Sequence, residues 1–376
     1  MRNTIMMSRI RKGNAGATSH GEGPSRRAVL KGAAAAGGAV AAAWMPPRVH
    51  AQSGKLDIVK GTLTPLVAYA HVYSAIEKGF FAKYGIQNQI DSVAIAASLP
   101  IVARGDYDWG RSSNGAGYLN ALNSGLAIVG AVDRLTYICS ADNGLVVSKK
   151  NYDAGVRSFA DLKSKTVAVN APGTANDYWV AQSLAKNNMA KSDIKIVYLS
   201  YPDMLAAMSS GSADAGYLPE PLMTKGIEEG RINLVEPIIK VAPGDNIGMM
   251  FFGAKFIEKS GGDIATRWLM AYLEGIRFAQ NPKNRDEVIK IVAKETRLEP
   301  DLVGKIYDRR ISWPQVEPNG RVDAERMLKT LGNFFLEAKQ IDKLPDARRV
   351  FDPTQLQAAL KQVGEVRNDE HLLCKL

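Results

Sequence analysis

The sequence predicts an α/β protein of two lobes with mostly parallel sheets, followed by a helical C-terminal part. Three observations support this prediction. Strand-like and helix-like segments alternate with short connections from residue 56 to residue 132. The same alternation restarts near residue 145, and the segments after residue 252 show mainly helical periodicity.

The first half opens with a short apolar strand, after which Thr64 is a favourable N-cap and Pro65 a favourable first helical residue. Gly79 is a favourable helix end. The expected strands cover residues 56–59, 89–93, 106–110 and 127–132, and the expected helices cover residues 65–78, 99–104 and 115–123.

The second half has its own strands and helices. Ser158 and Asp161 resemble a capping box that opens a one-turn helix. The expected strands cover residues 145–147, 166–170, 194–199, 213–217 and 249–252. The expected helices cover residues 174–186, 202–210, 221–229, 264–279, 285–294, 299–307 and 324–338.

A short internal repeat relates the two halves. Both Gly105–Gly110 and Gly211–Gly216 read Gly-x-x-Asp-x-Gly, and each follows a short apolar helix and leads into a strand. The first glycine of each can adopt the left-handed conformation that ends a helix. Polar residues follow each strand, and open α/β sheets bind ligands beyond the carboxyl ends of their strands. Two such halves facing each other would form a two-sided cleft.

The N-terminus has the order of a secretory signal. Basic residues precede an Ala- and Gly-rich run over residues 32–45. Val49 and Ala51 then supply small residues at the two positions that a signal peptidase reads, so we expect cleavage after Ala51. The run is too short and too rich in glycine for a membrane anchor. The string Ser25-Arg26-Arg27-Ala28-Val29-Leu30-Lys31 resembles a twin-arginine export motif, with Val29 where an aromatic residue is usual.

Charge and cysteine content narrow the function classes. The whole chain carries a net charge of +10, but residues 1–51 hold eight basic residues and one acidic residue. The basic character therefore lies mostly in the signal, which removes the main support for nucleic-acid binding. Cys139 and Cys374 cannot form a disulfide-dense scaffold; they could pair in an oxidising compartment or remain two separate thiols.

Three segments resemble one family of periplasmic proteins. Residues 73–86 read YSAIEKGFFAKYGI, residues 158–169 read SFADLKSKTVAV, and residues 211–221 hold Gly-Ser-Ala-Asp-Ala and Pro-Glu-Pro. They are similar, in the same order, to motifs of solute-binding proteins for nitrate, sulfonate, taurine, bicarbonate and thiamine-pyrimidine precursors. The matches specify the superfamily and not the ligand.

The resemblance implies a type II periplasmic-binding fold. One lobe would comprise residues 54–142 and 248–376, and the other residues 143–247. Two crossovers near residues 142–145 and 245–248 would form the hinge, and the lobes would close around a ligand. The closed protein, expected to be a monomer in the periplasm, would deliver a small anionic or heterocyclic solute to an ABC permease in the inner membrane.

Candidate ligand-binding residues lie at strand ends and helix starts. Helix N-termini attract anions through their free N–H groups and their dipole. Each hydroxyl at these positions could instead serve only as a cap. The candidates are Thr64, Ser112, Ser113, Asn114, Gly173, Thr174, Tyr178, Tyr201, Glu220 and Asn246.

The aromatic and charged candidates each have an alternative. Only one of the adjacent Tyr178 and Trp179 can face a cleft well, and the other should pack. Glu220 could accept hydrogen bonds from an amine or amidine. It could instead form an ion pair or supply the N-terminal charge of a helix that begins at Pro221. Arg111 could form a fork for a carboxylate or sulfonate, or could point into solvent.

Catalysis is not expected. The thiamine-pyrimidine synthases that share this fold carry a cysteine-rich motif and a substrate histidine, whereas this chain has two isolated cysteines and, after residue 51, only His71 and His371. Neither histidine has metal-ligand spacing, and we expect no cofactor and no metal. Two alternatives stay open, an enzyme of the synthase type and a ligand-sensing subunit for a membrane kinase.

Overall fold

The structure is a computed structural model that describes residues 55–138, 142–309 and 316–367. The predicted signal residues Arg26, Arg27 and Ala51 lie outside these ranges, as do Cys139, His371 and Cys374. None of the helices in the described ranges is long and apolar enough to cross a membrane.

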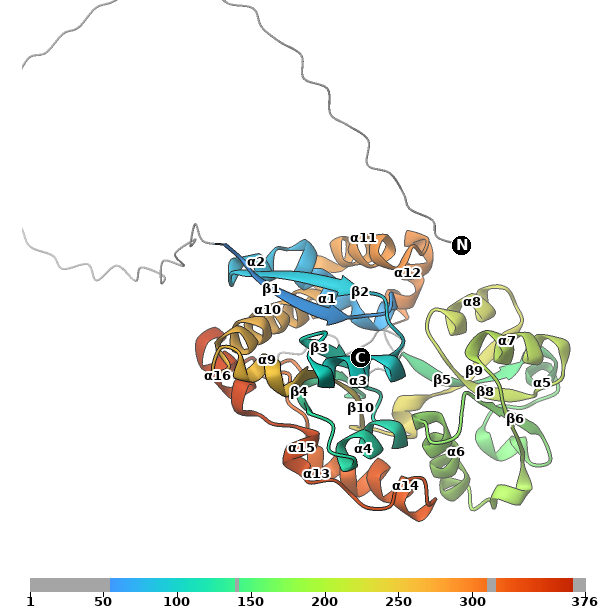
Figure 1. Ribbon diagram of the computed structural model, residues 1–376. Coiled ribbons are helices and arrows are strands. Elements are labelled where there is room, and N and C mark those ends of the chain that lie inside the picture. Colours follow the sequence, from blue (N-terminus) through green and yellow to red (C-terminus); the bar gives the residue numbers. More distant parts are fainter. Residues whose placement is uncertain (1–54, 139–141, 310–315, 368–376) are drawn as a thin grey trace, which may run out of the picture. The chain divides into compact units, whose positions relative to one another are not determined.

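Two five-stranded sheets organise the chain (Figure 1). The first sheet has the order β2-β1-β3-β10-β4 and the second the order β7-β6-β8-β5-β9. The strands of the first sheet are β1 (Asp57–Thr62), β2 (Ile86–Asp91), β3 (Trp109–Arg111), β4 (Ile128–Thr136) and β10 (Asn246–Gly253). The strands of the second sheet are β5 (Asn143–Ser148), β6 (Thr166–Val169), β7 (Lys195–Tyr198), β8 (Ala215–Pro219) and β9 (Ile232–Pro237).

Both sheets are mixed rather than mostly parallel. β2, β1 and β3 pair in parallel, as do β7, β6 and β8. β10 is antiparallel to β3 and β4, and β5 is antiparallel to β8 and β9. β5 and β10 are the strands that directly follow the two passages of the chain between sheets, so their direction is set by the crossing and not by a βαβ unit.

Helices connect and cover the strands. Those of the N-terminal half are α1 (Ala70–Glu77), α2 (Phe80–Lys83), α3 (Ile95–Arg104) and α4 (Ala116–Asn123), with a 3-10 turn η1 (Val67–Tyr69) before α1. Those of the second sheet are α5 (Lys149–Asp153), α6 (Ala175–Lys186), α7 (Tyr201–Ser210) and α8 (Leu222–Glu228), with the 3-10 turns η2 (Phe159–Leu162), η3 (Lys191–Asp193) and η4 (Ile238–Lys240).

The chain after β10 is helical, as predicted. It contains α9 (Ala254–Glu258), α10 (Asp263–Gln280), η5 (Pro282–Asn284), α11 (Arg285–Thr296), α12 (Pro300–Asp308), α13 (Ala324–Met327), η6 (Leu328–Gly332), α14 (Asn333–Glu337), α15 (Ala347–Val350) and α16 (Thr354–Val363). α10 packs against α1 and α16 (Figure 1). A Cβ on Gly275 would lie 2.3 Å from the His71 carbonyl oxygen, so α10 approaches α1 closely only because residue 275 is glycine.

The predicted start of the first helix is wrong. Thr64 is not an N-cap, because the helical turn begins at Val67 with Leu66 before it. The Thr64 hydroxyl instead donates to the Val93 carbonyl over 3.2 Å, which ties the ends of β1 and β2 together. The predicted end is confirmed, since Gly79 follows α1 with a left-handed φ of 70°.

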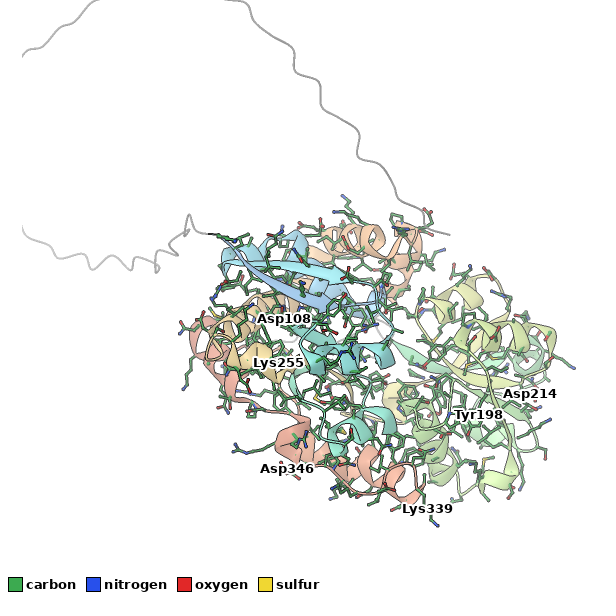
Figure 2. All side chains as sticks on the ribbon, in the orientation of Figure 1. Asp108, Tyr198, Asp214, Lys255, Lys339 and Asp346 are labelled. Carbon is green, nitrogen blue, oxygen red and sulfur yellow. The ribbon has the colours of Figure 1, made fainter. Side chains whose placement is uncertain are left out.

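The internal repeat is a structural repeat. Gly105 and Gly211 end α3 and α7 with φ angles of 88° and 82°. Asp108 exchanges two hydrogen bonds with the backbone of Lys60 in β1, and Asp214 does the same with Thr166 in β6. Both carboxylates are labelled in Figure 2. The two sheets therefore use the same device to attach the third parallel strand to the central one.

Candidate functional site

Segments that follow the carboxyl ends of β3 and β6 touch each other. The Ala116 N–H, at the start of α4, donates to the Gly173 carbonyl over 3.0 Å. The anion site predicted at this helix start therefore has one of its amides already engaged by the second sheet. A second contact joins Lys305 of α12 to Glu228 of α8 over 2.7 Å.

Arg111 ends β3 and is buried, with 1% of its surface exposed. Its Nη2 donates to the Val93 carbonyl over 2.9 Å and to the Thr64 hydroxyl, and its Nη1 donates to the Thr62 carbonyl over 3.4 Å. The alternative that it points into solvent is wrong. Arg111 holds the carboxyl ends of β1 and β2, and its Nε has no hydrogen-bond partner within the part of the chain that the structure describes.

Arg134, near the end of β4, is a second buried arginine, with 6% of its surface exposed. Within the described part of the chain, its guanidinium forms no ion pair and donates no hydrogen bond, and its Nε is buried without a partner. The guanidinium carbons of Arg134 and Arg111 each lie 5.6 Å from the centre of the Tyr69 ring. Two like charges therefore flank one aromatic side chain.

Among the described titratable groups, Asp142 is the counter-charge beside the two arginines, and His71 adds no charge near pH 7. Burial, reinforced by the Arg134 charge, lowers the pKa of His71 to about 3, so this histidine is neutral near pH 7. Burial raises the pKa of Asp142 to about 6, and Arg134 opposes that shift. Burial also lowers the pKa of Arg111, and the charge of Arg134 acts in the same direction.

Ser112, Asn114 and Asn246 belong to a buried hydrogen-bond network. The Ser112 hydroxyl contacts the Asn114 amide oxygen over 3.0 Å, and the Asn114 amide donates to the Asn246 side chain. Asn246 donates in turn to the Asp133 carboxylate over 2.6 Å. These three side chains join β3, β4 and β10. Ser113, between them, is half-buried, and its carbonyl accepts from the Gly115 N–H over 2.8 Å.

Thr174 and Gly173 lie in the turn between β6 and α6. Thr174 precedes α6, but its side chain does not cap the helix. Its hydroxyl instead lies 2.8 Å from the Asn170 side-chain oxygen and 2.8 Å from the Ala171 carbonyl. Gly173 has a φ of 73°, and its N–H donates to Asp177 over 3.1 Å. The hydroxyl thus stabilises its own turn.

Tyr178 joins the second sheet to the second passage between sheets. Its hydroxyl donates to Asp245 over 3.0 Å, and its ring packs edge-on against Phe334 with centroids 5.5 Å apart. Asp245 also pairs with Arg326 over 3.3 Å. Tyr201 opens α7; its hydroxyl faces Asn176, and burial raises its pKa. Trp179 packs between Tyr137 and Tyr217.

Glu220 acts at the start of α8. Its carboxylate accepts from the Thr224 N–H over 3.0 Å and from the Thr224 hydroxyl over 2.9 Å, and the side chain is 6% exposed. This is the helix N-terminal role that the sequence offered as the alternative to ligand binding. α8 begins at Leu222, with Pro221 as the residue before the helix.

The sequence-based reasoning missed Arg134 and Tyr69. A signal for Arg134 existed, because Asp133 and Arg134 are two adjacent charges inside an otherwise apolar run that reaches Leu135. Charged residues are rarely buried unless they are paired or functional. The described residues contain no group of His, Cys, Asp and Glu side chains arranged to hold a metal.

Comparison with known proteins decides the family. A model of the NMT1-like family matches residues 57–293. The chain belongs to the NMT1-like family. Two relatives are a putative aliphatic sulfonates-binding protein of Escherichia coli K12, 22% identical over 203 residues, and the nitrate/nitrite binding protein NrtA of a Nostoc species, 25% identical over 263 residues. The matches cover 54% and 65% of this chain, but only 61% and 58% of those relatives.

Solved structures share the fold. This NMT1-like chain superposes on the sulfonate-binding protein SsuA of Escherichia coli with a TM-score of 0.66 and 17% identity, over 80% of this chain and 99% of SsuA. The nitrate-binding protein NrtA of Synechocystis gives 0.69 and 15%, over 84% and 91%. The desulfurization enzyme DSZB gives 0.60 and 16%, over 81% and 99%. The predicted periplasmic-binding fold is therefore confirmed, and the same fold also carries catalysis.

Proposed function

We propose that this protein is the solute-binding component of an ABC importer, and that it captures a small anionic or heterocyclic solute between two closing lobes. The observation that carries the proposal is the connection between its sheets. β5 follows β4 and β10 follows β9 along the chain, so the chain changes sheets twice, and the contacts that the described residues make between the halves are non-covalent. Two halves that are joined by two stretches of backbone, and otherwise only by contacts that can break, can open and close about a hinge.

The family supports this function. The relatives named above are described as a putative aliphatic sulfonates-binding protein and a nitrate/nitrite binding protein, and the structural neighbours include periplasmic proteins that bind sulfonate and nitrate. We propose residues 54–142 with 248–376 as one lobe and residues 143–247 as the other. The partner would be a permease in the inner membrane, and the protein would act as a monomer without a cofactor.

Thermal-shift and calorimetric screening tests the binding function. The purified protein, without the first 51 residues, is titrated with alkanesulfonates, nitrate, short carboxylates and uracil. We expect at least one solute to raise the midpoint of unfolding in proportion to ln(1 + [L]/Kd). Failure of every solute to stabilise the protein would overturn the proposal.

Export through the twin-arginine route is tested separately. We propose that Arg26 and Arg27 direct a folded precursor to the periplasm and that cleavage follows Ala51. Replacing both arginines with lysine should leave the precursor uncleaved in the cytoplasm, as seen by fractionation and immunoblotting. Normal export of that variant would replace the twin-arginine route with the general secretory route.

Two other functions remain distinguishable from transport. If the protein were an enzyme of the fold that DSZB represents, an identified solute would change in mass during incubation with the purified protein; we expect it to be recovered unchanged. If the protein served a membrane kinase, affinity purification of the solute-loaded protein from solubilised membranes would recover the kinase. We expect a permease and its ATPase instead.

A further inference from the structure

We infer that Arg134 is the residue that binds the solute's anionic group, that Arg111 supplies a second fixed positive charge beside it, and that the solute is therefore a carboxylate or a sulfonate and not a neutral heterocycle. The inference rests on the proposed solute-binding function and narrows its substrate class.

Arg134 is held in place without using its hydrogen-bond donors. Its guanidinium lies beside the Tyr69 ring and across the backbone of Gly248, which follows the second passage between sheets. A Cβ at residue 248 would lie 2.1 Å from Nη2 and 2.4 Å from Nε of Arg134. The side chain therefore depends on glycine at this position. Packing fixes the group, and its Nε–H has no hydrogen-bond partner among the described residues.

Arg111 differs from Arg134 because most of its contacts are internal. Thr62, Thr64 and Val93 accept its Nη donors, so its charge is positioned by the strand ends themselves. Its Nε, the Tyr69 hydroxyl and the Arg134 Nε are all buried, and none makes a hydrogen bond of normal geometry within the described residues.

The balance of charge calls for an anion. Burial of a cation without a counter-charge is strongly unfavourable, and two neighbouring cations repel each other as well. Asp142 is the carboxylate that stabilises Arg134, and with a pKa of about 6 it is mostly ionised near pH 7. Two guanidinium groups therefore share at most one carboxylate in the described residues, which leaves one positive charge in excess. A solute anion would supply the missing charge.

The geometry of the donors selects the class of anion. A guanidinium presents parallel N–H bonds that match two oxygens of a carboxylate or a sulfonate. A neutral heterocycle leaves both charges uncompensated and gains only weak hydrogen bonds in exchange for their remaining hydration. The Tyr69 hydroxyl can donate to a further oxygen. We therefore expect the site to distinguish solutes by their charge more strongly than by their shape.

Calorimetry with ethanesulfonate, propionate and uracil tests the inference in wild type, Arg134→Met, Arg134→Lys and Arg348→Met. Arg348 is exposed, so its variant is the matched control for loss of one positive charge. We expect wild type and Arg348→Met to bind ethanesulfonate or propionate with the same affinity. Arg134→Met should lose at least about tenfold in affinity and Arg134→Lys should retain part of it, because lysine keeps the charge and loses the fork.

The stability of the unliganded variants separates binding from structure. A site arginine that carries an uncompensated charge should give an Arg134→Met protein that unfolds at the same temperature as wild type or higher. A lower unfolding temperature together with unchanged anion affinity would show a structural role and overturn the inference. Binding of uracil, unaffected by Arg134→Met, would overturn it and leave the solute-binding function intact. If none of the probes in the wider screen binds wild type, both fail.

Discussion

Asp108 and Asp214 make the same pair of backbone contacts in the two sheets. The Asp108 carboxylate accepts from the Lys60 N–H over 2.7 Å, and the Asp214 carboxylate accepts from the Thr166 N–H over 2.7 Å. In each case the aspartate N–H donates back to the carbonyl of the same partner over 2.8 Å. The two halves are thus built on one local design, although their sequences share only a few residues.

Replacing either aspartate should weaken its own sheet. We expect Asp108→Ala and Asp214→Ala each to lower the free energy of unfolding by about 1–3 kcal/mol, because a strand amide loses a charged acceptor. Asp214→Ala should cost more, since Asp214 also accepts from Asn151 over 2.7 Å. Urea titration followed by circular dichroism measures both. Asp106→Ala, at an exposed surface ion pair, is the control and should change stability by less than about 0.5 kcal/mol.

The buried Asp133 should make stability depend on pH. Burial raises its pKa from 3.8 to about 7 in the folded protein. Between these two values the folded state binds more protons than the unfolded state, so stability falls as pH rises and levels off above about pH 7. The slope is at most about 1.4 kcal/mol per pH unit for one group. Asp142 contributes with the same sign up to its pKa of about 6.

Asp133→Asn isolates this contribution. The variant should be less stable overall, because the new side-chain amide would face the amide of Asn246 and the N–H of Glu317, which both donate to the carboxylate in wild type. Its stability should nevertheless fall less steeply with pH than that of wild type. Denaturant unfolding at intervals from pH 4.5 to pH 8 gives the comparison. Parallel profiles for the two proteins would contradict the prediction.

Gly248→Ala should impair solute binding more than folding. The added Cβ meets the far end of the Arg134 side chain, which can move, rather than backbone. We therefore expect an affinity for the bound anion at least about tenfold weaker, with a change in stability of about 1 kcal/mol or less. Gly117→Ala is the matched control, because nothing lies within 4 Å of a Cβ there. Equal affinities for the two variants would argue against the position assigned to Arg134.

Tyr178→Phe should favour the open form. The substitution removes the hydroxyl that donates to Asp245 and leaves the ring against Phe334. We expect the free energy of unfolding to fall by about 0.5–1.5 kcal/mol and solute affinity to fall by a similar free energy, because the contact joins the two halves. Tyr198→Phe is the control, since Tyr198 is 46% exposed and its hydroxyl contacts Asp177 at 3.5 Å (Figure 2). Equal losses from both variants would refute this role.

Local structure followed closely from the sequence. Glycine at residues 79, 105 and 211 marked the helix ends, and the pair Ser158 and Asp161 marked a short helix that the structure contains. These features depend on interactions between residues near one another in the chain. The start of α1 was predicted incorrectly because the Thr64 hydroxyl is used by Val93 and Arg111, which are distant in sequence.

Strand direction and the centre of the site were beyond local patterns. An apolar strand such as β10 reads the same whichever way its neighbours run, so the antiparallel pairs could not be foreseen. Arg134 was overlooked because it stands out by having no hydrogen-bond or ion-pair partner in the described residues. A missing partner can be recognised only once the neighbouring residues have been placed in space. The proposed ligand role of Ser112 and Asn114 competes with their internal hydrogen bonds for the same reason.

With Arg134 in its proposed role, and without an ion pair in the described residues, dissolved salt ions compete with the solute for its guanidinium. Chloride and other background ions are attracted to the same charge, so an incoming solute has to displace them and shed its own water. Selectivity then depends on how the free energy of binding the solute compares with the free energy of releasing the background ion and the solute's own water, and not on the strength of the contacts alone. Higher salt slows the encounter of an anionic solute with the site and lowers its apparent affinity together.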